Sequence, residues 1–381
     1  MAQRSSTAKT RTSKPAGKSG GKSAALNTDL LKRLCETPGV PGREERVREL
    51  ITKEVKGLFD SIETDAMGSL ICRRAPRAKG GKKITSKAAP KSTMLLCHMD
   101  EIGFYISSID DNGYLFLNPA GGFDARNLFS RRVLVCGESG DHVGVMNPGG
   151  RPIHISSPDE RTKVPEVKEF FVDTGMSARD VNKHFQIGDY VVMHEPYVEM
   201  GDKLVSKAMD NRVACWLGIE SVRELDRLGI GHANEIVVAF TTQEEVGLRG
   251  AKTASFAVKP DIGIGIDVTL ACDTPGVPKA EAVTTHGKGF GLHIKDGSFI
   301  SDHGLVTEVE KLAKKHRITY QRTILAAGGQ DGAAAQQAAA GARAVGITVG
   351  TRYIHTVTEM IDRRDLGAAR DILARIMGEV K

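Results

Sequence analysis

Cysteine is scarce in this sequence, and none of it is arranged as a metal or redox motif. The six cysteines among 381 residues are Cys35, Cys72, Cys97, Cys136, Cys215 and Cys272. No two of them form a C-x-x-C pair and their spacings give no disulfide framework, so we expect reduced thiols in a cytoplasmic protein. Cys97 precedes a candidate ligand, His98, but neighbours on a strand point to opposite faces, which argues against Cys97 as a ligand.

Long apolar runs are absent as well. No stretch is long enough to span a bilayer, and the first residues lack the apolar core of a secretory signal. We therefore expect no contact with membranes. The 40% hydrophobic and 26% charged content is that of an ordinary globular protein, and 381 residues allow one large domain or two of average size.

Acidic side chains are missing from two segments. Residues 1–28 hold six lysines and arginines and no acid, so that subtracting them from the net charge of +6 leaves a near-neutral body. This segment has almost no large apolar side chains, and we expect a disordered basic tail, 1–28. Its charge leaves a weak contact with a polyanion as one alternative and a transit peptide as another. Residues 73–91 lie between two strand-like runs and predict a long exposed hairpin or loop.

The pattern of apolar residues changes twice along the chain. Helical spacing after residue 28 leads to a strand-like run at 93–97. Between 102 and 203, short alternating runs are separated by Gly, Pro, Asn and Asp, which is typical of a small β-rich domain. From 204 onward strands and helices alternate, which indicates an α/β sheet flanked by helices. We therefore predict a discontinuous α/β domain, 29–101 and 204–381, interrupted by a β-rich insertion, 102–203.

Five separated motifs place acids and histidines at or just beyond predicted strand ends. They are His98-Met99-Asp100-Glu101, Asp210-Asn211-Arg212, Gln243-Glu244-Glu245-Val246-Gly247, Asp267 and Arg352-Tyr353-Ile354-His355. In open α/β sheets, ligand sites collect at the carboxyl ends of the strands. Two imidazoles and a surplus of carboxylates are what a pair of first-row divalent cations needs.

Taken singly, four of these motifs also have simpler structural explanations. Asp100 lies two residues after His98 and can hold its ring in one orientation, but His98 alone can equally be a surface histidine. Asp210 can bridge two cations through its two oxygens, or it can simply cap the helix that follows. Asp267 and His355, taken singly, fit a turn residue and a structural histidine.

The adjacent acids Glu244 and Glu245 are harder to explain structurally. They follow the apolar strand at 236–240, and two carboxylates pointing into one site repel unless a cation or a proton intervenes. We expect one of these two glutamates to bind a cation and the other to act as a general base for water. A Gly-rich turn at 328–332 can approach a substrate closely, but no phosphate-binding fingerprint surrounds it.

Together these motifs resemble the M42 family of metallo-aminopeptidases, the TET aminopeptidases, often labelled glutamyl aminopeptidases. The matching text lies at 98–104, 208–212, 243–251 and 352–356, with a further match from 171 to 189. The resemblance covers roughly residues 29 to 380. It implies an α/β/α catalytic domain of the zinc-peptidase type, an inserted small β-barrel-like dimerisation domain, and assembly of dimers into a dodecamer.

The resemblance also assigns roles to individual residues. The implied metal ligands are His98, Asp210, Glu245, Asp267 and His355. Asp210 is the implied bridge between two divalent cations, zinc or cobalt with manganese as a third option, and the division of His98 and Asp267 between them is left open. Glu244 resembles the general base and Asp100 the acid that orients His98. Gly329, Gln330 and Asp331 are implied near the substrate, although the family usually has Gly-Gly-Thr-Asp-Ala there, which leaves the side-chain preference undefined.

The implied activity is removal of N-terminal residues from peptides, with a water between the two cations as the nucleophile. Two alternatives stay open at this point. A two-metal deacylase of N-acyl amino acids can be built on a similar fold, and it would not require a free amine. A non-catalytic scaffold can keep the fold, although the presence of all seven acids and histidines argues against it.

Overall fold

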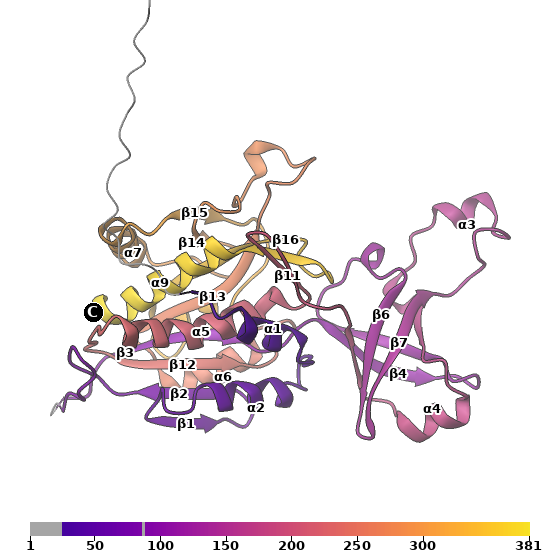
Figure 1. The fold of residues 1–381 in the computed structure, drawn as a ribbon, viewed down its shortest axis with the longest axis horizontal. Helices are drawn as coiled ribbons and strands as arrows, with labels where there is room; N and C mark the ends of the chain where they lie inside the picture. The colour runs from indigo at the N-terminus through magenta and orange to yellow at the C-terminus, as the bar shows by residue number, and fades with distance from the viewer. Residues whose placement is uncertain (1–24, 86–87) are drawn as a thin grey trace, which may run out of the picture.

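The computed structural model describes residues 25–85 and 88–381. An α/β body and a smaller barrel lie side by side in it (Figure 1). The predicted disordered tail and its contact with a polyanion fall mainly on residues 1–24, outside the described residues, and stay predictions. No helix in the described part of the chain combines the length and the hydropathy of a membrane span.

A mixed sheet of 11 strands forms the α/β body. Its strands are β1 (Ser61–Thr64), β2 (Leu70–Arg74), β3 (Ser92–His98), β10 (Val198–Met200), β11 (Lys203–Ser206), β12 (Glu235–Thr241), β13 (Ile262–Leu270), β14 (Phe290–Lys295), β15 (Tyr320–Ile324), β16 (Arg343–Arg352) and β17 (Glu359–Asp362). The order is β1-β2-β12-β3-β13-β16-β17-β11-β10, with β14 pairing β16 and β15 pairing β14. The four central strands, β12, β3, β13 and β16, run parallel. Their carboxyl ends therefore meet at one edge of the sheet.

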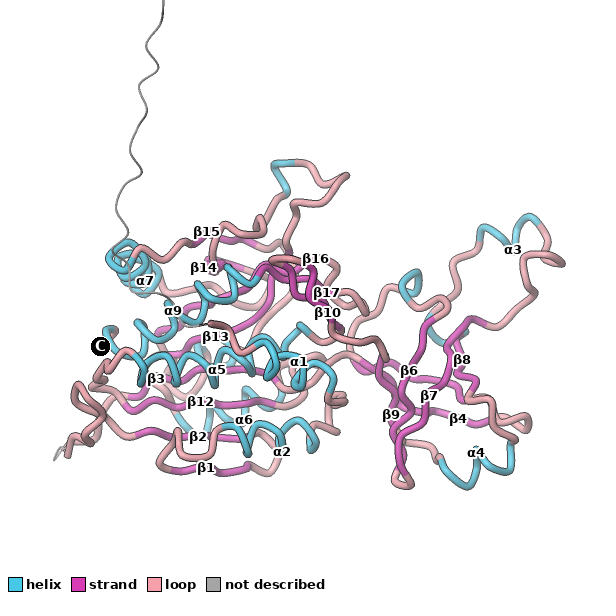
Figure 2. Tube along the Cα trace, in the orientation of Figure 1, coloured by secondary structure: helices cyan, strands magenta, loops and turns pink. Residues whose placement is uncertain are grey.

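Helices cover both faces of this sheet (Figure 2). They are α1 (Thr28–Glu36), α2 (Glu45–Glu54), α5 (Met209–Arg227), α6 (Arg249–Val258), α7 (His303–His316), α8 (Gly332–Gln336) and α9 (Arg363–Glu379). Successive side chains of β3 point to opposite faces of the sheet, as the period of two in a strand requires. Leu95 and Cys97 pack in the core with α5, whereas Met94 and Leu96 pack in the core with α6 and α8. Cys97 therefore points into the α5 core, as its place beside His98 predicts.

The segment between β3 and β10 forms a closed six-stranded barrel with its own apolar core. Its elements are β4 (Gly103–Ile109), β5 (Leu115–Ala120), β6 (Arg131–Gly137), β7 (Gly140–Pro148), α3 (Pro158–Thr162), β8 (Phe170–Asp173), α4 (Ala178–His184) and β9 (Tyr190–Met193). The strands pair in the order β4-β5-β8-β7-β6-β9, and Phe104 and Phe170 are fully buried inside. This confirms the predicted fold class, an α/β body with an inserted barrel. The chain has returned to the large sheet by β10, which pairs with β11.

A buried ion pair joins the entry to the barrel to the segment that follows β11 in the body. Glu101 lies just before β4, and Lys207 lies just after β11. The Lys207 ammonium donates to both carboxylate oxygens of Glu101, at 2.7 and 2.6 Å, and the Arg212 guanidinium lies 3.4 Å from one of them. Each side chain of the Glu101–Lys207 pair is less than 5% exposed. Glu101, the last residue before the insertion, therefore ties the entry to the barrel to the segment that leads from β11 into α5, beside the predicted site.

Candidate metal centre

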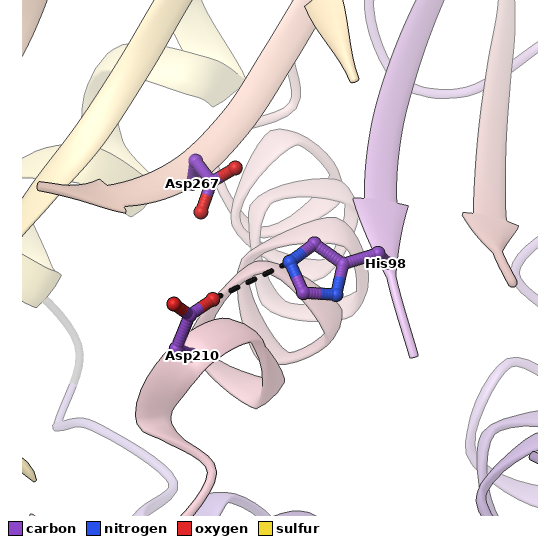
Figure 3. Close-up of side chains that lie close together, drawn as sticks. All are labelled: His98, Asp210 and Asp267. Carbon is purple, nitrogen blue, oxygen red and sulfur yellow. Dashed lines mark ion pairs between the residues drawn. The ribbon is translucent and has the colours of Figure 1, made fainter. Parts of the chain in front are cut away.

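The central parallel strands deliver most of the predicted ligands to one edge of the sheet. His98 is the last residue of β3, Asp267 lies in β13, and Glu245 follows β12. Asp210 joins them from the start of α5, so that its carboxylate faces His98 and Asp267 (Figure 3). His355 comes from the loop after β16. This edge is where the sequence predicts a ligand site.

The five predicted ligands form two groups that share one residue. His98, Asp210 and Asp267 make the first group, and Asp210, Glu245 and His355 make the second. Within each group the candidate ligand atoms all lie within 4.8 Å of one another. Asp210 Oδ1 lies 3.4 Å from His98 Nε2, and Asp210 Oδ2 lies 3.4 Å from His355 Nε2. One carboxylate thus presents a separate oxygen to each group, which is the geometry of a bridging ligand.

Asp210 is not the cap of α5, the simpler explanation for its position. The Asp210 and Asn211 backbones are not helical, and the regular helix begins after them. Asn211 Oδ1 accepts the N–H of Ala214 at 3.0 Å, which is the contact of an N-cap residue. Asn211 Nδ2 donates to Asp267 Oδ1 at 3.0 Å. Asn211 therefore caps the helix and orients one ligand, which leaves the Asp210 carboxylate free to face the two histidines.

Asp100 fixes three neighbouring groups at once. Its Oδ1 accepts the N–H of Glu244 and its Oδ2 the N–H of Glu245, each at 3.1 Å. Oδ1 also lies 3.5 Å from His98 Nδ1. Asp100 is completely buried. It can therefore orient the His98 ring, as the H-x-D spacing predicts, and it also holds the main chain that carries the adjacent acids.

Glu244 lies beside the first ligand group without belonging to either group. Its Oε2 lies 3.8 Å from His98 Nε2, and its side chain is 12% exposed. Its neighbour Glu245 is in the second group, with Oε2 3.5 Å from His355 Nε2. The two adjacent acids therefore separate into one candidate ligand and one carboxylate that belongs to neither ligand group.

The electrostatics of the cluster are those of a cation site. Burial raises the pKa of Glu245 and of Asp267 well above the usual range, and the nearby charge of Asp210 raises both further. Burial also opposes the charged form of Asp210, but the rings of His355 and His98 outweigh it and hold the pKa of that carboxyl below its usual value. Glu245 Oε1 is buried and has no hydrogen-bond partner among the described residues. Two imidazoles, three carboxylates and this unsatisfied oxygen fit divalent cations.

We expect metal loading of the metal-free protein to release protons near pH 7. Burial raises the pKa of Glu245 and Asp267 well above the usual range, so these carboxyls keep their protons to a higher pH than ordinary carboxyls do. Ligands must lose those protons to coordinate a cation. Titration calorimetry with Zn²⁺ in buffers of different ionisation enthalpy measures the number released, which should fall as the pH rises. An observed heat that does not depend on the buffer would contradict this prediction.

The Gly-rich turn lies beside the cluster, and its three predicted substrate residues differ in exposure. Gly329 is exposed, whereas Gln330 and Asp331 are 3% and 2% exposed. Asp331 accepts a hydrogen bond from the Thr241 hydroxyl at the end of β12, and burial raises its pKa to about 6. Gln330 packs over Gly265 and Gly346, where a Cβ on either glycine would collide with its amide.

Two buried acids at the site were not among the predicted residues. Glu44 Oε1 accepts the N–H of Gly42 at 2.8 Å and of Gln243 at 3.0 Å, and burial raises the pKa of Glu44 to about 7. Glu359 accepts the N–H of Asp210 at 2.9 Å and of His355 at 2.7 Å. Glu359 lies four residues after His355 at the head of the apolar run Met360-Ile361. An acid in such a place, close to a candidate ligand, is the sequence signal that could have identified it.

Comparison with known proteins identifies relatives that are aminopeptidases, in agreement with the family that the motifs resemble. The family model of M42 glutamyl aminopeptidase matches residues 81–372. A TET aminopeptidase from the marine sediment archaeon Thaumarchaeota archaeon SCGC AB-539-E09 is 31% identical, with a TM-score of 0.86 and coverage of 93% of this chain and 96% of that one. The TET1 peptidase of Pyrococcus horikoshii is 27% identical with a TM-score of 0.80, covering 93% and 99%, and can assemble into a tetrahedron or a large octahedral shell.

A lysyl aminopeptidase of Pyrococcus furiosus is 29% identical over 363 residues, which are 93% of this chain and 98% of the relative. The family match spans more than half of the chain, and each of these three relatives covers 93% of it. The ligand groups are those that the resemblance implied, brought together by the fold. The chain therefore belongs to the M42 family of metal-dependent aminopeptidases.

Proposed function

We propose that this protein is a co-catalytic two-metal aminopeptidase that removes N-terminal residues from peptides. One observation carries the proposal: the two ligand groups share Asp210, and a separate buried acid, Glu244, lies beside them. A single-cation enzyme would not need a second complete group. The set of imidazole and carboxylate donors suits zinc or cobalt best, with manganese as a third option.

The residues that would hold the cations are those of the two groups. His98 and Asp267 would serve one cation and Glu245 and His355 the other, with Asp210 between them. When bound, divalent cations act as Lewis acids that polarise a carbonyl oxygen and lower the pKa of water. Asp100 keeps the His98 ring and the Glu244–Glu245 main chain in place, so that the donors are oriented before any cation arrives.

Glu244 is the proposed general base. It takes a proton from the attacking water and then delivers a proton to the amine of the leaving peptide. Burial raises the pKa of Glu244 well above its usual range in the metal-free protein, with the charge of Asp267 adding to the rise. A carboxylate with a raised pKa is a stronger base than an exposed one, which suits it to both proton transfers.

The proposal extends to the substrate loop and to assembly. Gly329, Gln330 and Asp331 would border the substrate, with the exposed Gly329 close enough for contact and the buried Gln330 and Asp331 supporting the loop. The barrel would mediate pairing of two copies, and the pairs would build a dodecamer. The assembly of the Pyrococcus horikoshii relative into large closed shells supports this part of the proposal.

The test is a panel of chromogenic aminoacyl substrates, each with a free or an N-acetylated amine. Metal-stripped protein is assayed alone and with zinc, cobalt or manganese added back. We expect metal-dependent cleavage of the free-amine set only, because an aminopeptidase recognises the substrate amine. Cleavage of only the acetylated set would instead identify a deacylase. If no substrate were cleaved with any metal, the non-catalytic scaffold would be the remaining interpretation.

A further inference from the structure

Glu359 is a buried carboxylate that contacts two of the predicted ligands without being one of them. It is the first residue of β17 and is 2% exposed. Its Oε2 accepts the N–H of Asp210 at 2.9 Å, and its Oε1 accepts the N–H of His355 at 2.7 Å. Neither ligand group includes Glu359. One side chain thus joins the main chains of two ligands that enter the site from different elements.

Neither Asp210 nor His355 has the backbone conformation of a regular helix. Asp210 has φ −79° and ψ 104°, outside the helix that follows it. His355 has φ 63°, in the left-handed region that side chains other than glycine rarely adopt, and Tyr353 in the same loop has φ 60°. A side chain such as His355 persists in that region only where surrounding contacts hold it. The Glu359 carboxylate supplies that contact to both N–H groups.

The effect of Glu359 falls unevenly on the two ligand groups. The group of Asp210, Glu245 and His355 has two of its three members anchored by Glu359, whereas the group of His98, Asp210 and Asp267 has one. The remaining members have other supports, since Asp100 holds the Glu245 N–H and Asn211 donates to Asp267. Loss of Glu359 should therefore loosen one cation site much more than the other.

We propose that Glu359 is a positioning residue that sets the geometry, and hence the affinity, of the cation site formed by Asp210, Glu245 and His355. The inference rests on the proposed two-metal function. Residues that orient metal ligands typically contribute a factor of about 10 to 100 in metal affinity. The Glu359→Gln variant keeps the size of the side chain but offers a single acceptor oxygen, and its amide group would turn a donor toward one of the two N–H groups.

A matched control lies in α9. Asp365 is 1% exposed, and it accepts the N–H of Gly287 and of Gly289, each at 2.7 Å. The Asp365→Asn variant therefore also removes one oxygen from a buried carboxylate that binds two main-chain N–H groups. It does so away from the ligand groups, and any general cost of such a change appears in both variants.

The experiment titrates the metal-free full-length proteins with Zn²⁺ against a chromogenic chelator and records the absorption bands of added Co²⁺. For Glu359→Gln we expect the second equivalent to bind about 10- to 100-fold more weakly, with altered cobalt bands, while the first changes by only a few-fold. Asp365→Asn should match the wild type. If Glu359→Gln bound two equivalents of Zn²⁺ with wild-type affinities and gave wild-type Co²⁺ absorption bands, the inference would be overturned.

Two further comparisons keep the result interpretable. If circular dichroism shows that metal-free Glu359→Gln is unfolded, Glu359→Asp replaces it. That variant keeps the charge but is one methylene shorter, and we expect the same selective weakening of the second equivalent, whereas wild-type binding by it overturns the inference. If the wild type itself binds only one cation, the two-metal proposal fails, which is a different result from two cations bound independently of residue 359.

Discussion

Replacement of Glu244 by glutamine is expected to lower kcat by about 100- to 10,000-fold, the range that a general base contributes. Glutamine keeps the shape of the side chain but cannot accept the proton of the attacking water. Glu244 belongs to neither ligand group, so the variant should bind the same number of cations as the wild type. Steady-state kinetics on a free-amine substrate and metal analysis of the same preparation measure the two quantities.

The neighbouring acid provides the matched control. Glu245→Gln makes the same chemical change one residue along the chain, but Glu245 belongs to the second ligand group. This variant should therefore lose affinity for one cation, and excess metal should restore part of its activity. Excess metal should not help Glu244→Gln. If the Glu244→Gln enzyme had a near-normal kcat, Glu244 would not be the general base.

The ligands could be predicted from the sequence because the fold aligns strand ends. His98, Glu245 and Asp267 each lie at or just after the end of an apolar run, and parallel neighbours bring such ends to one edge. The adjacency of Glu244 and Glu245 also implied a cation or a proton between them. Local patterns of this kind are visible in one sequence.

The supporting contacts could not be predicted in the same way. Glu359 binds Asp210 across 149 positions of the chain, and Asp100 binds Glu245 across 145. Neither of these two contacts leaves a periodic or local pattern, because each joins a side chain to a distant main-chain N–H. The only local signal for Glu359 is its place four residues after His355. The start of α5 left two interpretations of Asp210 open for a related reason. Asp and Asn both favour cap positions, and only the hydrogen bond from the Ala214 N–H to Asn211 shows which of the two residues is the cap.

Strands were missed where the apolar pattern is short or interrupted. β14 contains Gly291 and a buried histidine, His293, and β17 has four residues beginning with a buried acid, Glu359. β17 lacks the apolar alternation that identifies a strand in isolation, whereas β14 shows it at Phe290, Leu292 and Ile294 but over only six residues. Their pairing with β16 supplies the order instead. The helix that follows the Gly-rich turn, α8, is short and ends at Gln336, before the glycine at position 341 takes a positive φ of 95°.

Replacement of Asp210 by asparagine is expected to weaken both cation sites, and by more than the factor of about 100 that a supporting residue contributes. Asp210 is the only residue common to the two ligand groups of the described chain, with one oxygen toward His98 and the other toward His355. Asparagine keeps one neutral oxygen and replaces the other with an N–H donor. Activity should therefore fall to background and stay there at moderate excess of metal.

The discriminating measurement compares this variant with one change in each group. Asp267→Asn removes a carboxylate from the first group alone, and His355→Ala removes an imidazole from the second group alone. Gel-filtered proteins analysed for metal should retain about one cation in each of these single-group variants and none in Asp210→Asn. Circular dichroism of the metal-free proteins controls for folding. If Asp210→Asn retained one tightly bound cation, Asp210 would serve a single site, and the two groups would have to be separate centres instead of one bridged pair.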